Sequence, residues 1–559
     1  MNRSAGDYMR AAWVQIAVAV LFARQLSGGV AAAQASHAVT VAGYGTVDFP
    51  TSTRSAVAQR EFSRGVLLLH LFHYDEAADA FRAAEHADTG FVMAYWGEAM
   101  TYTHPVWDEQ DTAAGRKALG RLAATADARE GEAPTERERG FMRAVDALYG
   151  DGPKAKRDTL FSERMEQVLR ANPSDDEARL FYVLSLMGLS QGVRNVPTYL
   201  HAAQIAESVF TRHPREPAAT HYWIHAMDDP DHAAQALPAA RALARVAPDA
   251  GHAQHMTSHI FMALGMWDDV VRANENAMRM VNGPAARQGR APFYCGHVNS
   301  WLAYGYAEQG RLTDARRIVS GCAQQAEKAR RKTDMSNLDP DVSAMGSAVD
   351  MWTHYVIDGE DWSGYMAQWA PDLDSAAAPR AAYQFGRGFA AARRGDGKAA
   401  SDARAAFEQE RARLVAFVAA EHDPDPSDAE YVKGLSVLGM ELQAVSGLAA
   451  HDGSTDSTDA VALVSRAAAI EDSLAYAFGP PPVYKPSHEL LGELLLGLKR
   501  YGDAEREFQT ALAHQRRRVL SLRGLAAAAA GAGDTATASR ARGDLRAIQH
   551  FGVARAAGT

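Results

Sequence analysis

A repeat of 34 residues constrains the fold of this chain more than any other feature of its sequence. The clearest copy begins at Lys485, and other units with the same internal spacing begin near Ala58, Pro217, Gly251 and Gly296. A unit of this length cannot bury its apolar face alone, so several units must stack against one another. In the copy that begins at Lys485, the small and large apolar positions are occupied by Leu491, Gly492, Tyr501, Ala504, Phe508 and Ala511.

The spacing of these small and large residues resembles the tetratricopeptide repeat, in which each unit is a pair of antiparallel helices. The resemblance implies an all-α fold, a right-handed solenoid of helical hairpins whose first helices line a concave wall. No strands are expected.

The repeats and their flanking segments predict six regions. These are a signal peptide at 1–35, an extended segment at 36–57, repeats with insertions at 58–175, histidine-rich central repeats at 176–344, further helical repeats at 345–478, and C-terminal repeats with a cap at 479–559.

The first 35 residues have the pattern of a cleavable secretory signal. Arg3 and Arg10 precede an apolar run at 11–23, and Ala33 and Ala35 form a small-residue cleavage site. An uncleaved anchor is the alternative. The pattern predicts a periplasmic or secreted protein with no transmembrane segment once the signal is removed.

The two cysteines would then meet an oxidising compartment. Cys295 directly precedes the unit that begins at Gly296, and Cys322 lies in the second helix of that unit. Because these points lie together in an antiparallel hairpin, we predict a disulfide between them. Two buried free thiols, or Cys295 acting as a metal ligand beside His297, are the alternatives.

Histidines are concentrated in the central repeats. His221 and His225 fall at positions 5 and 9 of one unit, and His255 and His259 fall at the same positions of the next. Residues four apart on a helix are neighbours, and adjacent first helices pack side by side, so we expect the imidazoles to converge on the concave wall. The predicted metal-ligand set is His221, His225, Asp229, His252, His255, His259 and His297.

Such a set suits a transition metal. Neutral imidazole favours zinc, copper, iron or nickel, and a nearby carboxylate widens the choice to iron or manganese. Two other interpretations stay open. The histidines could line a metal-free ligand groove, or they could be satisfied polar groups in a packed wall.

Elsewhere in the predicted groove, Trp96, Tyr304 and Glu308 fall at positions that face a ligand, and we expect a peptide, a protein or a small molecule to bind there. Core packing is the alternative for Trp96. The formal net charge of -10 argues against a general phosphate-binding surface, so no nucleic-acid partner is expected.

The sequence does not predict a reaction. It contains no phosphate-binding loop, no His-Glu-x-x-His and no Cys-x-x-Cys. The histidine block at 221–225 and 252–259 is similar to that of exported bacterial repeat proteins of no assigned activity. We therefore expect an exported scaffold whose histidine-rich groove binds a ligand together with a metal ion. A metal-dependent enzyme and a metal-free peptide- or protein-binding module are the alternatives.

Overall fold

The computed structural model describes residues 38–190, 193–329, 343–373, 377–420, 426–450 and 456–550. The predicted signal peptide lies outside these ranges. Among the helices described within them, none combines the length and the apolar character that crossing a bilayer requires.

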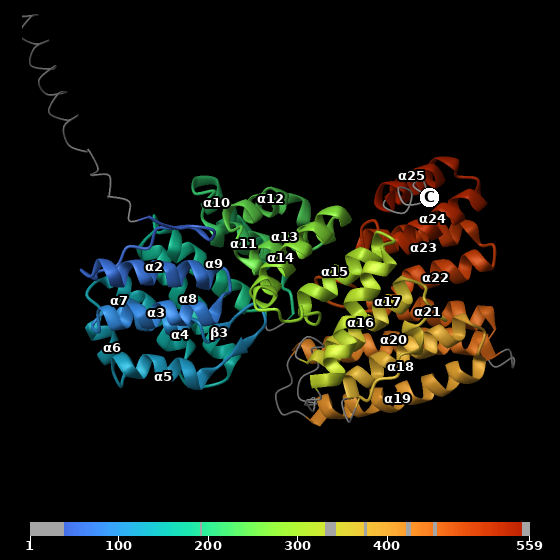
Figure 1. Cartoon of the computed structure of the whole chain (residues 1–559), viewed down its shortest axis with the longest axis horizontal. Coiled ribbons are helices and arrows are strands. Elements are labelled where there is room, and N and C mark those ends of the chain that lie inside the picture. The colour runs from blue at the N-terminus through green and yellow to red at the C-terminus, as the bar shows by residue number, and fades with distance from the viewer. Residues whose placement is uncertain are drawn as a thin grey trace, which may run out of the picture.

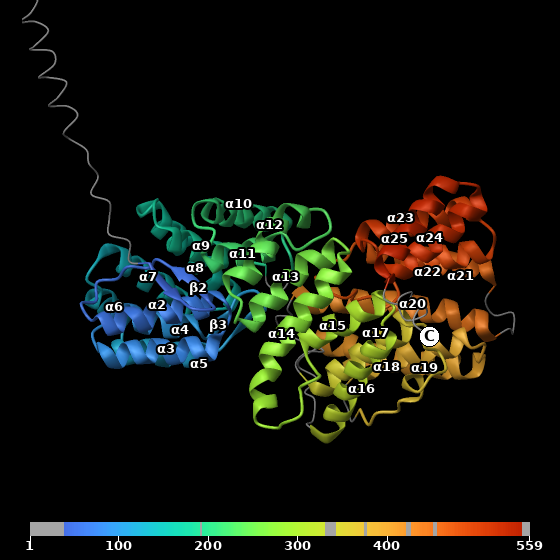
Figure 2. The same cartoon turned by 45° about the horizontal axis from the view of Figure 1, so that its top comes forward.

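The described chain is a stack of helices, α2 to α25, each packed mainly on the helices next to it in sequence. Figure 1 shows the order of the stack, with the blue N-terminal helices at one end, the green helices α10 to α14 in the middle and the red helices α22 to α25 at the far end. Figure 2 shows the same order from a second direction. The all-α solenoid of helical hairpins that the repeat implied is confirmed.

In the histidine-rich repeats, the first helix of each unit begins at or next to the predicted start of the unit. Helices α11, α13 and α15 begin at Pro217, Gly251 and His297. The α-helices are α2 (Ala56–His70), α3 (Tyr74–Ala87), α4 (Val92–Met100), α5 (Thr112–Leu122), α6 (Ala126–Glu132), α7 (Glu136–Leu148), α8 (Lys154–Ala171), α9 (Asp176–Gly188), α10 (Val196–Arg212), α11 (Pro217–Ala226), α12 (Leu237–Val246), α13 (Gly251–Ala263), α14 (Trp267–Arg287), α15 (His297–Glu308), α16 (Leu312–Ala329), α17 (Ala344–Asp358), α18 (Ala377–Arg393), α19 (Gly397–Ala420), α20 (Pro426–Ala450), α21 (Ser457–Glu471), α22 (Ser487–Gly497), α23 (Tyr501–His514), α24 (Val519–Ala532) and α25 (Thr535–Ile548), with 3-10 turns η1 (Ala233–Ala236) and η3 (Met366–Gln368).

Glycine and phenylalanine alternate in the packing at both ends of the stack. The buried ring of Phe81 lies between Gly65 and Gly97, where an added Cβ would come within 2.7 and 2.3 Å of ring carbons. At the other end, Phe508 lies in the same way against Gly492 and against Gly524 of the next hairpin, at 2.9 and 2.2 Å. Because glycine has no side chain, two consecutive first helices can both pack against the same phenylalanine ring. This packing explains why small and large residues recur with a fixed period.

The expectation of no strands is wrong at two places. The strands β1 (Val39–Val41) and β2 (Gly45–Val47) form an antiparallel pair, and so do β3 (Thr103–His104) and β4 (Glu109–Gln110). The first pair precedes the first helical hairpin, and the second lies in the connection between α4 and α5, so neither falls within a helix of the repeat. The first pair contacts the central repeats, since Thr46 N–H donates to the carbonyl of Arg215 and Asp249 N–H donates to that of Gly43.

Candidate functional site

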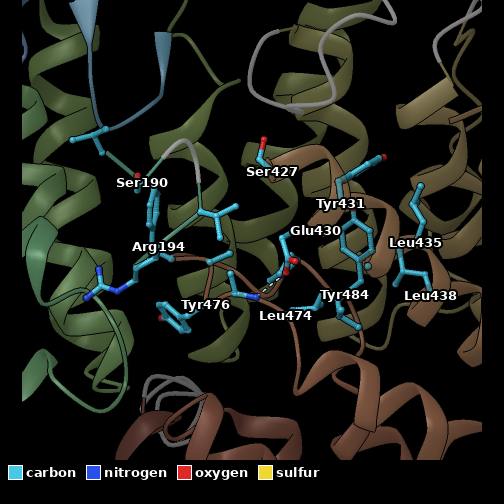
Figure 3. Close-up of a pocket in the computed structure, with 18 of the residues that line it drawn as sticks. Ser190, Arg194, Ser427, Glu430, Tyr431, Leu435, Leu438, Leu474, Tyr476 and Tyr484 are labelled. Carbon is cyan, nitrogen blue, oxygen red and sulfur yellow. Dashed lines mark hydrogen bonds between the residues drawn. The ribbon is translucent and has the colours of Figure 1, made fainter. Parts of the chain in front are cut away.

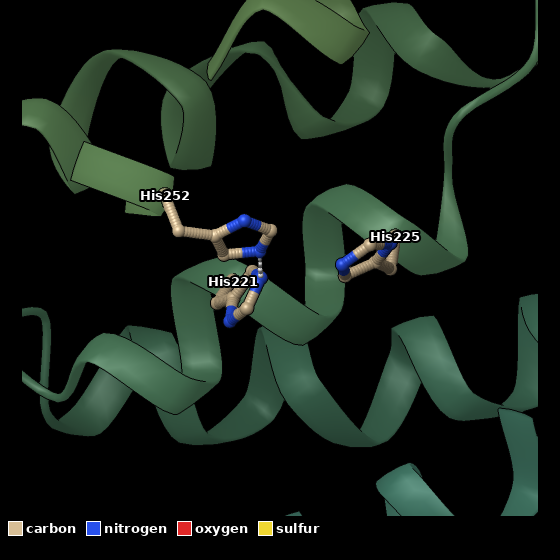
Figure 4. A group of neighbouring side chains, drawn as sticks. All are labelled: His221, His225 and His252. Carbon is tan, nitrogen blue, oxygen red and sulfur yellow. Dashed lines mark hydrogen bonds between the residues drawn. The ribbon is translucent and has the colours of Figure 1, made fainter. Parts of the chain in front are cut away.

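The six predicted histidines meet on three successive first helices. Helix α11 contributes two of them, α13 three and α15 one. They form two groups, and within each group the potential ligand atoms all lie within 4.8 Å of one another. The first group is His221, His225 and His252, shown in Figure 4, and the second is His255, His259 and His297.

In the first group, His221 is held by the backbone. Its Nδ1 lies 2.6 Å from the carbonyl oxygen of His70, which can only accept, so Nδ1 carries the hydrogen and Nε2 carries the lone pair. That Nε2 lies 3.2 Å from Nε2 of His252. The Nε2 atom of His225 is buried and has no hydrogen-bond partner among the described residues.

The second group repeats this arrangement with side-chain partners. Nδ1 of His255 lies 2.6 Å from Oδ1 of Asn274, whose Nδ2 donates to the carbonyl of Val270, so Oδ1 must accept. Nδ1 of His259 lies 2.5 Å from Oδ2 of Asp228. The two Nε2 atoms of His255 and His259 again face each other at 3.2 Å.

The two groups adjoin each other. The ring centroids of His225 and His259 are 5.8 Å apart, and those of His252 and His255 are 6.3 Å apart. Aromatic rings enclose the histidines, with Phe72 at 4.4 Å from His221 and Trp301 at 4.3 Å from His259, both as centroid distances. The site is therefore one histidine tract with two compartments in an apolar shell.

Burial keeps five of these imidazoles neutral at pH 7. It lowers the pKa of His221 to about 4 and that of His255 to about 3. Burial also lowers the pKa of His225, His252 and His259 well below the ordinary histidine value, and neighbouring histidines add to the effect. A neutral imidazole has one free lone pair, which is the form that binds a metal.

Asp228, and not Asp229, is the carboxylate that reaches the tract. Helix α11 ends at Ala226, so the helical spacing that placed Asp229 beside the histidines does not extend to it. Asp229 instead accepts from Arg194 at 2.8 Å and from His232 at 2.7 Å. Burial raises the pKa of Asp228 to about 7, against the opposing effect of Arg194.

Trp96 does not face a groove, and the prediction of a ligand contact there is wrong. It is fully buried in an aromatic core, with centroid distances of 4.9 Å to Phe181, 5.3 Å to Phe141 and 5.7 Å to Phe49. Phe49 comes from the segment before α2 and covers the face that the repeat alone would leave open. Core packing was the correct alternative.

Tyr304 and Glu308 are likewise buried, because the C-terminal repeats fold against α15. Arg518 donates to the hydroxyl of Tyr304 at 2.9 Å, and Val519 N–H donates to Glu308 at 2.7 Å. Arg518 is 1% exposed and also pairs with Glu489 at 2.9 Å. These residues form a buried network of hydrogen bonds and ion pairs and do not line an open groove.

The disulfide position lies close to the second histidine group. Cys295 and Cys322 are bonded, with their Cα atoms 4.7 Å apart, and both are buried. The bond ties the segment before α15 to α16. Cys295 is consequently not a free thiolate that could join His297 as a ligand.

One supporting residue, Asn274, escaped the sequence interpretation. Asn274 occupies position 24 of the unit that begins at Gly251, where other copies carry Phe81 and Phe508. A polar residue at a position that the other copies fill with an apolar side chain was the signal that could have identified it.

A third cluster of ligand-type side chains lies beneath the first group. His70 has both ring nitrogens engaged, Nδ1 at 2.8 Å from the hydroxyl of Tyr222 and Nε2 at 2.9 Å from Glu177. Glu216 completes the cluster. Because His70 has no free nitrogen, we interpret this cluster as support for the carbonyl that orients His221.

An apolar cavity of ≈350 Å³ opens beside the first group, with His225 in its wall (Figure 3). Most of its lining comes from the segment before α10, the end of α11, helix α20 and the segment 474–484. Tyrosine and leucine predominate among the residues labelled in the figure.

Comparisons with known proteins yield structural likeness alone, since no family model and no curated protein matches the chain. The Cut9–Hcn1 hetero-tetramer of the APC/C matches with 11% identity over 89% of this chain and 75% of that chain, at a TM-score of 0.32. The human IFIT1 dimer with m7Gppp-AAAA matches with 12% identity over 90% and 91%, at 0.32, and yeast Tom70 with 11% over 86% and 90%, at 0.30. At these values the likenesses carry no argument about function, and the fold rests on the hairpins of the chain itself.

Proposed function

We propose that the central repeats hold transition-metal ions in two adjoining three-histidine sites, within an exported solenoid that serves as a ligand-binding scaffold. The observation that carries the proposal is the convergence of three ring nitrogens within 4.8 Å in each group, with paired Nε2 atoms facing each other at 3.2 Å.

A metal ion would explain the short distances between the paired Nε2 atoms. Two lone pairs facing each other at this distance repel, so a hydrogen or a cation must lie between them. Two nitrogen ligands at ~2.0–2.1 Å from a tetrahedral zinc ion stand roughly 3.3 Å apart. The side chains thus need little movement to accept an ion in place of the bridging hydrogen.

The groups around the histidines support the same proposal. Metal-binding histidines ordinarily donate their second ring N–H to a carbonyl or carboxylate, which fixes the tautomer and raises ligand basicity. His221, His255 and His259 have such acceptors in the carbonyl of His70, in Asn274 and in Asp228.

The ligand set favours zinc, copper or iron. Each group offers three imidazoles and no carboxylate, and manganese prefers oxygen ligands. Three protein ligands leave a fourth position open to water or to a bound molecule, as in catalytic zinc sites. A metal-dependent enzyme is compatible with this arrangement, but no side chain in the site assigns a reaction.

Metal analysis tests the proposal. Protein isolated from its native compartment without chelators would be measured by inductively coupled plasma mass spectrometry, and the metal-free protein would be titrated with zinc, copper, iron and manganese. We expect up to two ions per chain.

Paired replacements separate the two sites. His221→Gln with His252→Gln should remove one ion, and His255→Gln with His259→Gln should remove the other. His213→Gln is the matched control, because the side chain of His213 is 62% exposed and belongs to neither histidine group. The proposal is wrong if the wild-type protein takes up none of the four metals stoichiometrically, or if both double variants take up as much as the control.

A further inference from the structure

The cavity beside His225 is built from segments that lie far apart in the sequence. Val106, Tyr199 and His225 come from the N-terminal half of the chain, and Leu438 and Tyr476 come from the C-terminal half. At ≈350 Å³ its volume lies within the roughly 300–1,000 Å³ typical of small-molecule sites.

The lining suits a flat apolar molecule. Four tyrosines and three leucines contribute to the wall, and Figure 3 shows Tyr431 and Tyr484 beside each other on one side, with Tyr476 toward the other end. Tyrosine rings offer broad faces for stacking at little cost in side-chain entropy. The walls therefore favour an aromatic ring over a flexible aliphatic chain.

The charged groups in the wall are already compensated. Arg194 pairs with Asp229 at 2.8 Å and lies over the ring of Tyr199. Glu430 pairs with Lys433 at 2.5 Å and accepts from the N–H of Ala475 at 2.8 Å. Because neither charge lacks a counterion, the cavity favours a neutral ligand over a carboxylate or an amine.

Two buried nitrogens in the wall have no partner among the described residues. They are Nε2 of His225 and Nε of Arg194, and both belong to side chains that line the cavity. Buried polar atoms are rarely left without a hydrogen bond in a native protein. A ligand hydroxyl can serve both, because its O–H donates to the imidazole nitrogen and its oxygen accepts from the guanidinium N–H.

We propose that this cavity binds a neutral aromatic molecule of one or two rings that carries a hydroxyl group, with the rings between the tyrosines and the oxygen at His225. The inference goes beyond the metal site and does not require it.

Three matched probes test the inference on metal-free and zinc-loaded protein by isothermal titration calorimetry. They are 2-naphthol, naphthalene without the oxygen, and 2-naphthoate with a charge. We expect saturable binding of 2-naphthol, binding of naphthalene that is about three- to tenfold weaker because the two hydrogen bonds are lost, and still weaker binding of 2-naphthoate.

A substitution that fills the cavity locates the binding. Gly434 lines the cavity on α20, and a Cβ added there would meet no atom within 4 Å. Gly434→Phe should reduce 2-naphthol affinity at least tenfold while helix content and zinc uptake stay unchanged. Gly434→Ala, which adds one carbon at the same place, should bind almost as the wild type does.

The outcomes separate this inference from the proposed metal function. If 2-naphthol does not bind up to its solubility limit, or if the Phe and Ala variants bind it equally, the cavity proposal is wrong whatever the metal result. If 2-naphthol binds and Gly434→Phe blocks it in a protein that takes up no metal, the cavity proposal holds and the metal proposal fails.

Discussion

Acid should destabilise the metal-free protein through its buried histidines, and His221 allows the effect to be calculated. Its folded pKa is about 4, whereas an unfolded histidine has a pKa of about 6.5. The unfolded state therefore takes up a proton first as the pH falls. The stability that neutral His221 contributes is complete above about pH 6.5 and is lost progressively toward pH 4.

Between pH 7 and pH 5 this single group should cost about 2 kcal/mol of unfolding free energy, since one pKa unit corresponds to about 1.4 kcal/mol. His255, with a pKa of about 3, should cost a similar amount over the same interval. The other buried histidines of the tract shift in the same direction, so the total loss should exceed that from any one of them.

The assay compares the wild type with His221→Gln, both stripped of metal, by chemical and thermal unfolding at pH 7 and pH 5. Glutamine keeps an N–H donor for the carbonyl of His70 but takes up no proton in this range. The variant should lose about 2 kcal/mol less than the wild type between the two pH values. His213→Gln, an exposed control, should lose as much as the wild type. An equal loss in His221→Gln and the wild type would refute the reasoning.

Three further perturbations test the site and the packing around it. Asp228→Asn should weaken metal binding at the second histidine group by about 10- to 100-fold and leave the first group unchanged, as measured by competition with a chromogenic chelator; equal loss at both groups would contradict this. Arg518→Met leaves several buried carboxylates without their cation and should destabilise the protein by about 3–5 kcal/mol in urea unfolding, whereas the half-exposed Arg523→Met should cost about 1 kcal/mol or less. Gly524→Ala drives a Cβ into the ring of Phe508 and should cost about 1–3 kcal/mol in thermal unfolding, whereas Gly502→Ala meets no atom and should be neutral or stabilising; similar melting of the two variants would rule out the packing explanation.

The convergence of the histidines could be predicted because it depends on local geometry alone. The 34-residue offset from His221 to His255 equals the repeat, and successive first helices α11 and α13 pack against each other, so equal positions meet. The helical-hairpin solenoid was predictable for the same reason. Both inferences need only contacts between neighbouring units.

The errors arose where the repeat stops or where distant segments intervene. Asp229 was misplaced because α11 ends at Ala226, after which the chain turns and helical spacing no longer applies. Trp96 was misassigned because Phe49 covers it, and Tyr304 because Arg518 reaches it from 214 residues away. Repeat positions predict contacts between neighbouring hairpins. They do not predict contacts with segments that are distant in the sequence, such as those made by Phe49 and Arg518.

Asn274 occupies a packing position of the repeat but contacts the histidine site. Where Phe81 and Phe508 fill the gap between hairpins at the same repeat position, the central unit buries an amide, which would cost free energy if its polar atoms lacked partners. Both are satisfied, since Nδ2 donates to Val270 and Oδ1 accepts from His255. This bond requires the Nδ1–H tautomer of His255, which directs the Nε2 lone pair at His259. At this repeat position, therefore, a hydrogen bond orients an imidazole lone pair toward a second imidazole. A metal ligand needs such support, whereas simple helix packing does not.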